Sequence, residues 1–149
     1  MRNIAEYIAR ERVLELAAET PADAIRELFQ PLAQSPLLAV PADFLEAVLQ
    51  REEEDSTGLG MGVAIPHARP VGLSDLCLCV GRSRVGIDFL APDNARVHFV
   101  FLIAAPVRPP ALYLQVVARI SWLMRNNSLR QQLYQTSDVD ELAEILMAH

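Results

Sequence analysis

Residues 51–69 bring together the side chains best suited to shared chemistry. They comprise a guanidinium, two hydroxyls, three glycines and an imidazole: Arg51, Ser56, Thr57, Gly58, Gly60, Gly62 and His67. The apolar run 63–65 is typical of a short buried strand, and Pro66 ends it because proline cannot donate to a strand ladder. We therefore expect His67 at the rim of a sheet, close to glycine backbone that can approach a ligand. The alternative is a turn that carries an incidental surface histidine.

Several familiar sites do not fit this stretch. A dinucleotide fingerprint follows a strand and opens a helix, whereas these glycines follow a helical pattern and open a strand. A phosphate-binding P-loop needs Gly-Lys-Ser/Thr, which is absent. His67, His98 and His149 form no ligand pair at zinc-site spacing, so we expect no metal. The Asp-Ser-Thr-Gly sequence around Ser56 is not the serine elbow of a hydrolase.

Histidine can itself be the nucleophile. Neutral imidazole attacks phosphorus when a hydrogen bond holds one ring nitrogen and the other points outward. Phosphoryl transfer also needs cationic and hydrogen-bonding groups around the equatorial oxygens, and Arg51, Ser56 and Thr57 are of the right types. No cofactor is implied by this chemistry.

The surrounding pattern predicts one α/β domain over residues 1–149, with helices on both faces of a sheet of about four to six strands. Expected helices cover 3–9, 22–32, 41–54, 111–125, 127–134 and the segment that Ser137 and Asp138 cap. Expected strands cover 13–17, 63–65, 76–80, 85–89 and 97–105, with a turn at 81–83. The run 97–105 is apolar nearly throughout, which indicates a central strand covered on both faces.

Composition limits which binding partners and which cellular location we expect for the protein. A net charge of −6 disfavours a general nucleic-acid binder and suits a basic partner. Cys77 and Cys79 point to the same face of a strand and are expected to be reduced core residues. The longest apolar run, 99–107, is too short for a membrane helix, which needs about 20 residues, and no secretory signal is evident. We expect a cytoplasmic protein without membrane insertion.

The motif resembles a known family. Arg51-Glu52, Ser56-Thr57-Gly58-Leu59-Gly60, Gly62-Val63-Ala64-Ile65-Pro66-His67 and Ala68-Arg69 are similar to the signature of the fructose/mannitol type of IIA domain in the bacterial phosphotransferase system, a class that includes nitrogen-regulatory IIA proteins. The resemblance covers essentially the whole chain. It implies a mixed, about five-stranded sheet sandwiched by helices. It also implies that His67 accepts a phosphoryl group from the phosphocarrier HPr or its nitrogen-branch paralogue, with Arg51 in the active site.

The chain departs from the family at one position. Where the family has a second active-site histidine, this chain has Tyr113, in the first turn of the helix that Pro109 and Pro110 introduce. We expect its hydroxyl to reach toward the His67 loop, either as a phosphoryl anchor or as a core aromatic. Tyrosine brings no positive charge, so transfer is expected to be slower than with histidine.

These observations lead to a functional expectation with alternatives. We expect a regulatory phosphoryl carrier that docks HPr through an apolar rim including Leu59 and Met61. Further partners would be a IIB component, a transporter or a kinase. The alternatives are a binding module that kept the fold without the chemistry, and a sugar-specific IIA component. The sequence leaves open whether the chain acts as an enzyme in the strict sense.

Overall fold

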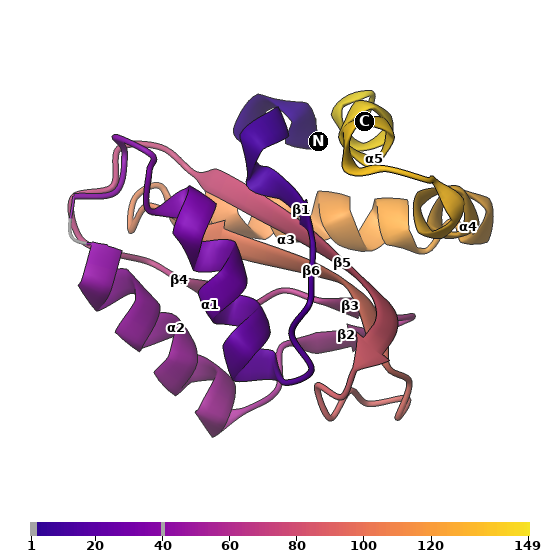
Figure 1. Ribbon diagram of the computed structural model, residues 1–149. Helices are drawn as coiled ribbons and strands as arrows, with labels where there is room; N and C mark the ends of the chain where they lie inside the picture. The colour runs from indigo at the N-terminus through magenta and orange to yellow at the C-terminus, as the bar shows by residue number, and fades with distance from the viewer. Residues whose placement is uncertain (1–2, 40) are drawn as a thin grey trace.

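The computed structural model describes residues 3–39 and 41–149 as a mixed sheet between two helical layers (Figure 1). The strand order is β1-β5-β6-β3-β2, and β4 pairs with β6 beyond the end of β3. The strands are β1 (Val13–Glu15), β2 (Gly58–Gly60), β3 (Val63–Ala64), β4 (His67–Ala68), β5 (Cys77–Ile87) and β6 (Val97–Ala104). Strand β6 runs antiparallel to β5 and parallel to β3 and β4, while β1 runs parallel to β5. The predicted α/β class and mixed sheet are confirmed, with six strands rather than five.

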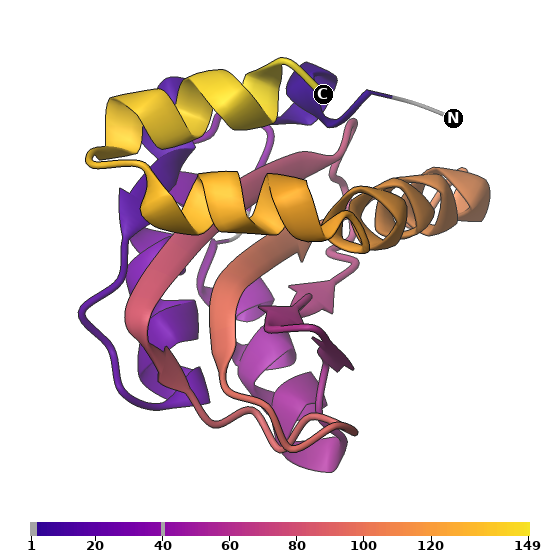
Figure 2. The ribbon, with the colours of Figure 1, turned by 90° about the vertical axis from the view of Figure 1, so that its right-hand side faces the viewer.

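Helices cover both faces of this sheet (Figures 1 and 2). They are η1 (Ile4–Tyr7), η2 (Arg10–Arg12), α1 (Pro21–Leu32), α2 (Pro41–Glu54), α3 (Pro110–Met124), α4 (Asn127–Gln135) and α5 (Val139–Met147). Helices α1 and α2 pack on one face, and α3, α4 and α5 cover the other. The expected helix at 3–9 is a short 3₁₀ turn that Asn3 caps.

Strand β6 separates the two hydrophobic cores. Its side chains alternate, so Phe101 and Ile103 enter the core under α3 while Val100 and Leu102 enter the core under α1 and α2. All four side chains are almost fully buried. This confirms the predicted central strand, and it gives the strands that pair with β6 a rigid support.

The turn expected at 81–83 is wrong, because β5 continues through it. A Cβ on Gly81 would lie 2.6 Å from Cγ of Leu16, so this glycine allows a close approach of two segments rather than a turn. Arg82 is buried in the same stretch and reaches Glu15 on β1. Cys77 and Cys79, also on β5, are buried and free, and burial raises the pKa of both thiols.

None of the helices in residues 3–39 and 41–149 is both long enough and apolar enough to cross a bilayer. The same residues contain no group of three or more histidine, cysteine or carboxylate side chains arranged to hold a metal ion.

Candidate active site

His67 is the first residue of β4 and pairs with Ile103 of β6. Pro66 separates β3 from β4, so the ring does not merely follow a strand, as the sequence suggested, but begins a new one. The ring atom Nδ1 lies 2.9 Å from the carbonyl oxygen of Ile65. Because a carbonyl only accepts, Nδ1 carries the proton in this contact, and Nε2 holds the free electron pair. The backbone thus selects the tautomer whose nucleophilic nitrogen is Nε2.

Tyr113, in the first turn of α3, meets that nitrogen. Its hydroxyl oxygen lies 3.0 Å from Nε2 and 3.3 Å from Nδ1 of His67, and the ring centroids are 4.8 Å apart. Since Nδ1 already donates to Ile65, the Tyr113 hydroxyl donates to Nε2. The hydroxyl therefore occupies the direction from which phosphorus would have to approach, and it must move before the ring can react.

Two guanidinium groups act on this pair of rings. The Arg69 guanidinium carbon lies 4.7 Å from the centroid of the Tyr113 ring, a cation–π distance. Arg51, in the last turn of α2, donates to the carbonyl oxygen of Asp55 at 2.8 Å. Within residues 3–39 and 41–149, neither guanidinium forms an ion pair with a carboxylate. Their positive charge is available to an anion.

Burial keeps both rings neutral, and the two cations add to this effect at His67 alone. The pKa of His67 is lowered from 6.5 mainly by burial and further by Arg51 and Arg69, against the opposing hydrogen bond to Ile65. Burial raises the pKa of Tyr113, although Arg69 and Arg51 oppose that shift. At neutral pH the site therefore holds a neutral imidazole, a neutral phenol and two fixed positive charges, which is a suitable arrangement for a nucleophile that attacks an anionic group.

The hydroxyls of Ser56 and Thr57 have protein partners. Ser56 donates to the carbonyl oxygen of Phe89 and accepts the N–H of Gly58 at 3.0 Å. Thr57 is buried and donates to Glu52 at 2.6 Å, while its own carbonyl accepts the N–H of Ile65 at 3.1 Å. Both residues order the segment between α2 and β3. The structure brings neither hydroxyl into contact with His67.

The structure separates the two expected docking residues. Leu59 is half-buried against the core that includes Tyr113. Met61 lies on the turn between β2 and β3 in a left-handed conformation (φ 58°), with its sulfur 3.9 Å from the Arg130 guanidinium. That turn meets the Phe99 end of β6, whereas His67 pairs four residues further along, roughly 13 Å away at strand spacing. Met61 therefore does not join His67.

Arg69 is the site residue that the sequence reasoning missed. It stood in the quoted motif without a role of its own. The available signal was its spacing, because residues two apart in an extended segment project to the same side, which places Arg69 beside the ring of His67. Its position over Tyr113, which comes from a distant helix, could not be read from spacing.

The fold and the site agree with a known protein family. A profile of the family described as "Phosphoenolpyruvate-dependent sugar phosphotransferase system, EIIA 2" matches residues 8–149, and the chain belongs to this family. Among its relatives, a "Nitrogen regulatory protein" of Bradyrhizobium diazoefficiens is 32% identical over 96% of this chain and 94% of the relative. The expected resemblance is confirmed.

Other comparisons agree on the fold and differ in length. The "PTS system fructose-specific EIIABC component" of Bacillus subtilis is 30% identical over 98% of this chain, which spans only 23% of that protein. The chain spans 66% of a fructose-specific EIIA component of Haloferax volcanii. The crystal structure of the nitrogen regulatory protein IIA-Ntr from Neisseria meningitidis superposes with a TM-score of 0.86 at 28% identity, covering 96% of this chain and 98% of the other.

Proposed function

We propose that this chain is a phosphoryl carrier whose His67 is reversibly phosphorylated on Nε2. The observation that carries the proposal is the hydrogen bond from Nδ1 to the Ile65 carbonyl, which leaves Nε2 as the nucleophile beside two cations without carboxylate partners. The electron pair of Nε2 forms the new N–P bond. The P–N bond of the donor phosphohistidine breaks, and its electron pair returns to the donor imidazole.

The neighbouring side chains would serve this transfer in distinct ways. Arg51 and Arg69 neutralise the phosphoryl oxygens, a role for which arginine geometry is well suited. The Tyr113 hydroxyl leaves Nε2 when the donor arrives and then donates to a phosphoryl oxygen. Ser56 and Thr57, which we expected to bind the phosphoryl group directly, have hydroxyls that donate to Phe89 and Glu52, and Thr57 supports the site through its backbone carbonyl, which accepts the N–H of Ile65.

The relatives favour a regulatory role in the cytoplasm. Nitrogen regulatory proteins recur among its relatives and its structural neighbours. The donor would be HPr or its nitrogen-branch paralogue, and the target would be a transporter or kinase that distinguishes the phosphorylated form from the free form. A IIB component would be the recipient if the chain served sugar uptake instead.

A phosphorylation assay tests the proposal. Incubation with phosphoenolpyruvate, Enzyme I and HPr should place an acid-labile phosphate on the protein, and His67→Ala should abolish it. His98→Ala is the matched control, because His98 is also half-buried and also bonded to a backbone carbonyl, that of Ser83. Absence of labelling, or labelling that persists in His67→Ala, would contradict the proposal.

A second candidate is a binding module that has lost phosphoryl transfer. The observation in its favour is the Tyr113 hydroxyl, which occupies the direction of attack on Nε2 at 3.0 Å. This candidate predicts no labelling of the wild-type protein and equal affinity of a partner for wild type and His67→Ala. The same assay, followed by a binding titration, therefore separates the two functions.

A further inference from the structure

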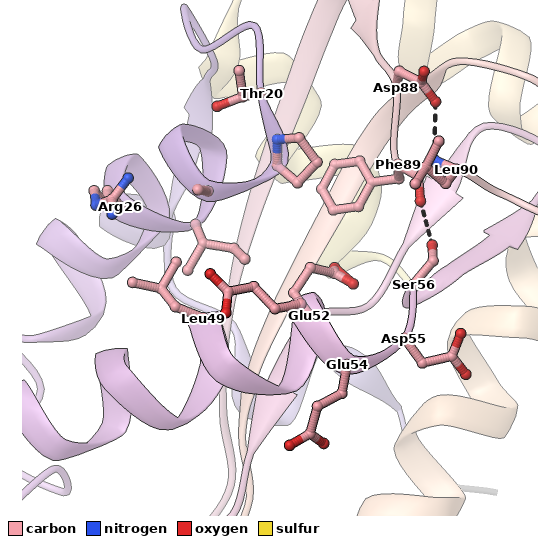
Figure 3. Close-up of a pocket in the computed structure, with 14 residues that line it drawn as sticks. Thr20, Arg26, Leu49, Glu52, Glu54, Asp55, Ser56, Asp88, Phe89 and Leu90 are labelled. Carbon is pink, nitrogen blue, oxygen red and sulfur yellow. Dashed lines mark hydrogen bonds between the residues drawn. The ribbon is translucent and has the colours of Figure 1, made fainter.

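A cavity is lined by residues other than His67 and Tyr113. It has a volume of about 710 Å³ and opens between the start of α1 and the end of α2, beside the segment that follows β5 (Figure 3). We call it the α1–α2 groove. Ile87, at the end of β5, pairs with Val97, whereas His67 pairs with Ile103, so the β5 end of the groove is six residues of β6, roughly 20 Å at strand spacing, from His67, while its α2 side lies nearer.

The groove has an apolar interior and an acidic border. Ile25 and Phe89 lie beneath its floor and are almost fully buried, so the accessible apolar side chains are Leu49, which is half-buried, and Leu90, which is exposed; Figure 3 shows the Phe89 ring directed toward α1. Carboxylates line the side formed by the end of α2 and the segment after β5: Glu52, Glu53, Glu54, Asp55 and Asp88. The one cation among the lining residues is Arg26, which is paired with Asp23 at 3.2 Å.

Most of this acidic charge is not needed by the fold. Glu52 accepts two hydrogen bonds from Thr57, and Asp88 accepts the N–H of Leu90, so both carboxylates have structural roles. Glu53, Glu54 and Asp55 are exposed and form no ion pair within the part of the chain that the structure describes. Figure 3 shows Glu54 and Asp55 extending outward from the apolar floor, where they would meet an approaching molecule.

Leu90 stands at the edge of the same groove. Its side chain is 78% exposed, and its backbone has a φ of 54°, a conformation that leucine rarely adopts. The Ser56 hydroxyl donates to the Phe89 carbonyl, and Asp88 accepts the Leu90 N–H, so both polar groups of the peptide bond that precedes Leu90 are held. An exposed leucine held in an unfavourable backbone conformation gives the folded chain no packing benefit.

We propose that the α1–α2 groove docks a basic segment of a partner protein that inserts one aliphatic or aromatic side chain flanked by Lys or Arg. The apolar side chain would lie between Leu49 and Leu90, above the buried Ile25 and Phe89. The flanking cations would face Glu53, Glu54 and Asp55 at the border. Arg51 and Glu52 are adjacent on α2 and project about 100° apart, so this surface and the His67 site occupy different sides of one helix. The proposal is independent of phosphoryl transfer.

Synthetic peptides test this surface directly. The probe is Gly-Arg-Arg-Leu-Lys-Arg-Gly, and its control carries serine in place of leucine at the same charge. The leucine peptide should shift the backbone amide resonances of residues 49–56 and 88–90 in a ¹⁵N spectrum, and it should bind about tenfold more tightly than the serine peptide, as one buried aliphatic side chain allows. Equal binding of the two peptides, or shifts elsewhere on the molecule, would overturn the proposal.

Matched variants separate the groove from general electrostatic attraction. Glu53→Lys should weaken binding of the leucine peptide about tenfold, whereas Glu46→Lys, an exposed position earlier on α2 outside the groove, should change it less than about twofold. Leu90→Gly keeps the left-handed backbone and removes the side chain, so it should weaken binding with unchanged or higher melting temperature. Equal effects of the two lysine variants, unchanged binding to Leu90→Gly, or equal shifts with spermidine alone would each contradict a protein segment as the occupant.

Discussion

Two arginine clusters on opposite sides of β6 show how the same side chain serves stability or function. Arg82 on β5 is 1% exposed and ion-paired with Glu15 at 2.8 Å. Its guanidinium also donates to the carbonyl oxygens of Leu133 and Thr136, each at 2.9 Å. Arg51 and Arg69, beside His67, have no carboxylate partner among the described residues.

The difference lies in which charges are compensated. A buried cation is tolerated only when a carboxylate and well-placed acceptors replace the water it has lost. Arg82 meets that requirement and connects β5 to β1 and to the segment between α4 and α5. Arg51 is half-buried and Arg69 exposed, so water solvates them without a carboxylate partner among the described residues, and they lie beside a nucleophile whose reaction brings in negative charge. Four experiments test this contrast.

Removal of Arg82 should have the largest effect. Arg82→Ala leaves buried carbonyl groups and Glu15 without their partner, which we expect to lower the free energy of unfolding by about 3 to 5 kcal/mol. Arg84→Ala is the control, because Arg84 is exposed and shares Glu15 and Thr136 with Arg82, and it should cost about 1 kcal/mol or less. Urea denaturation measures both. A similar loss in the two variants would end the distinction.

Removal of the cations near His67 should affect transfer and not stability. Arg51→Ala and Arg69→Ala should each slow phosphorylation of His67 by roughly tenfold to a hundredfold, since each removes a charge-assisted hydrogen bond of about 1.5 to 3 kcal/mol in the transition state. Their unfolding free energies should stay within about 0.5 kcal/mol of wild type. Arg125→Ala, an exposed position after α3, is the control for rate. A large loss of stability would place Arg51 or Arg69 in the structural class with Arg82.

Tyr113→Phe should have a smaller effect on the rate. The variant loses a neutral hydrogen bond to Nε2 before reaction and a stronger one to a phosphoryl oxygen afterwards, and the net difference of about 1 kcal/mol corresponds to about a fivefold slower transfer. Tyr113→His should be faster than wild type, because imidazolium would add positive charge at this position. Rapid-quench measurement of labelled His67 gives both rates. Unchanged rates in both variants would mean that Tyr113 only packs against the core and takes no part in transfer.

The smallest effect concerns pH. Because burial and the two arginines lower the pKa of His67, the unfolded chain binds more protons than the folded one between the lowered value and 6.5. Stability should therefore rise with pH across that interval and be independent of His67 above it, and His67→Gln should remove this slope. An NMR titration of the ring should give a pKa below 6.5 that rises in Arg51→Ala. A pKa above 6.5 in wild type would contradict the assigned environment.

The sequence pattern predicted most of the helices and strands, because where they begin and end depends on residues that are close in the sequence. The apolar run at β6, the cap residues Asn126 and Asp138, and the start of α3 at Pro110 all gave correct elements. Gly81 was misinterpreted because a glycine signals either a turn or a close approach, and only the tertiary neighbour Leu16 decides between them. The spacing of residues along one chain does not contain that neighbour.

The same limit applied at the site. The position of His67 at a strand end and the reach of Tyr113 toward it were predicted, since both depend on where single elements begin. The partners of Ser56 and Thr57, and the place of Arg69 over a ring from α3, depend on which segments lie across from one another. These contacts are fixed by topology, which the sequence pattern did not reveal.

The Arg82 contacts also bear on how the chain is synthesised. Thr136 follows Arg82 by 54 positions, so at ribosomal rates of about 5 to 20 residues per second the guanidinium waits roughly 3 to 11 s for its carbonyl partners. During that interval β5 and β6 have no cover from α4 and α5, and the apolar face under those helices is open. A nascent chain stalled before Leu133 should therefore recruit chaperones and remain sensitive to protease, and release of the segment 133–147 should end both.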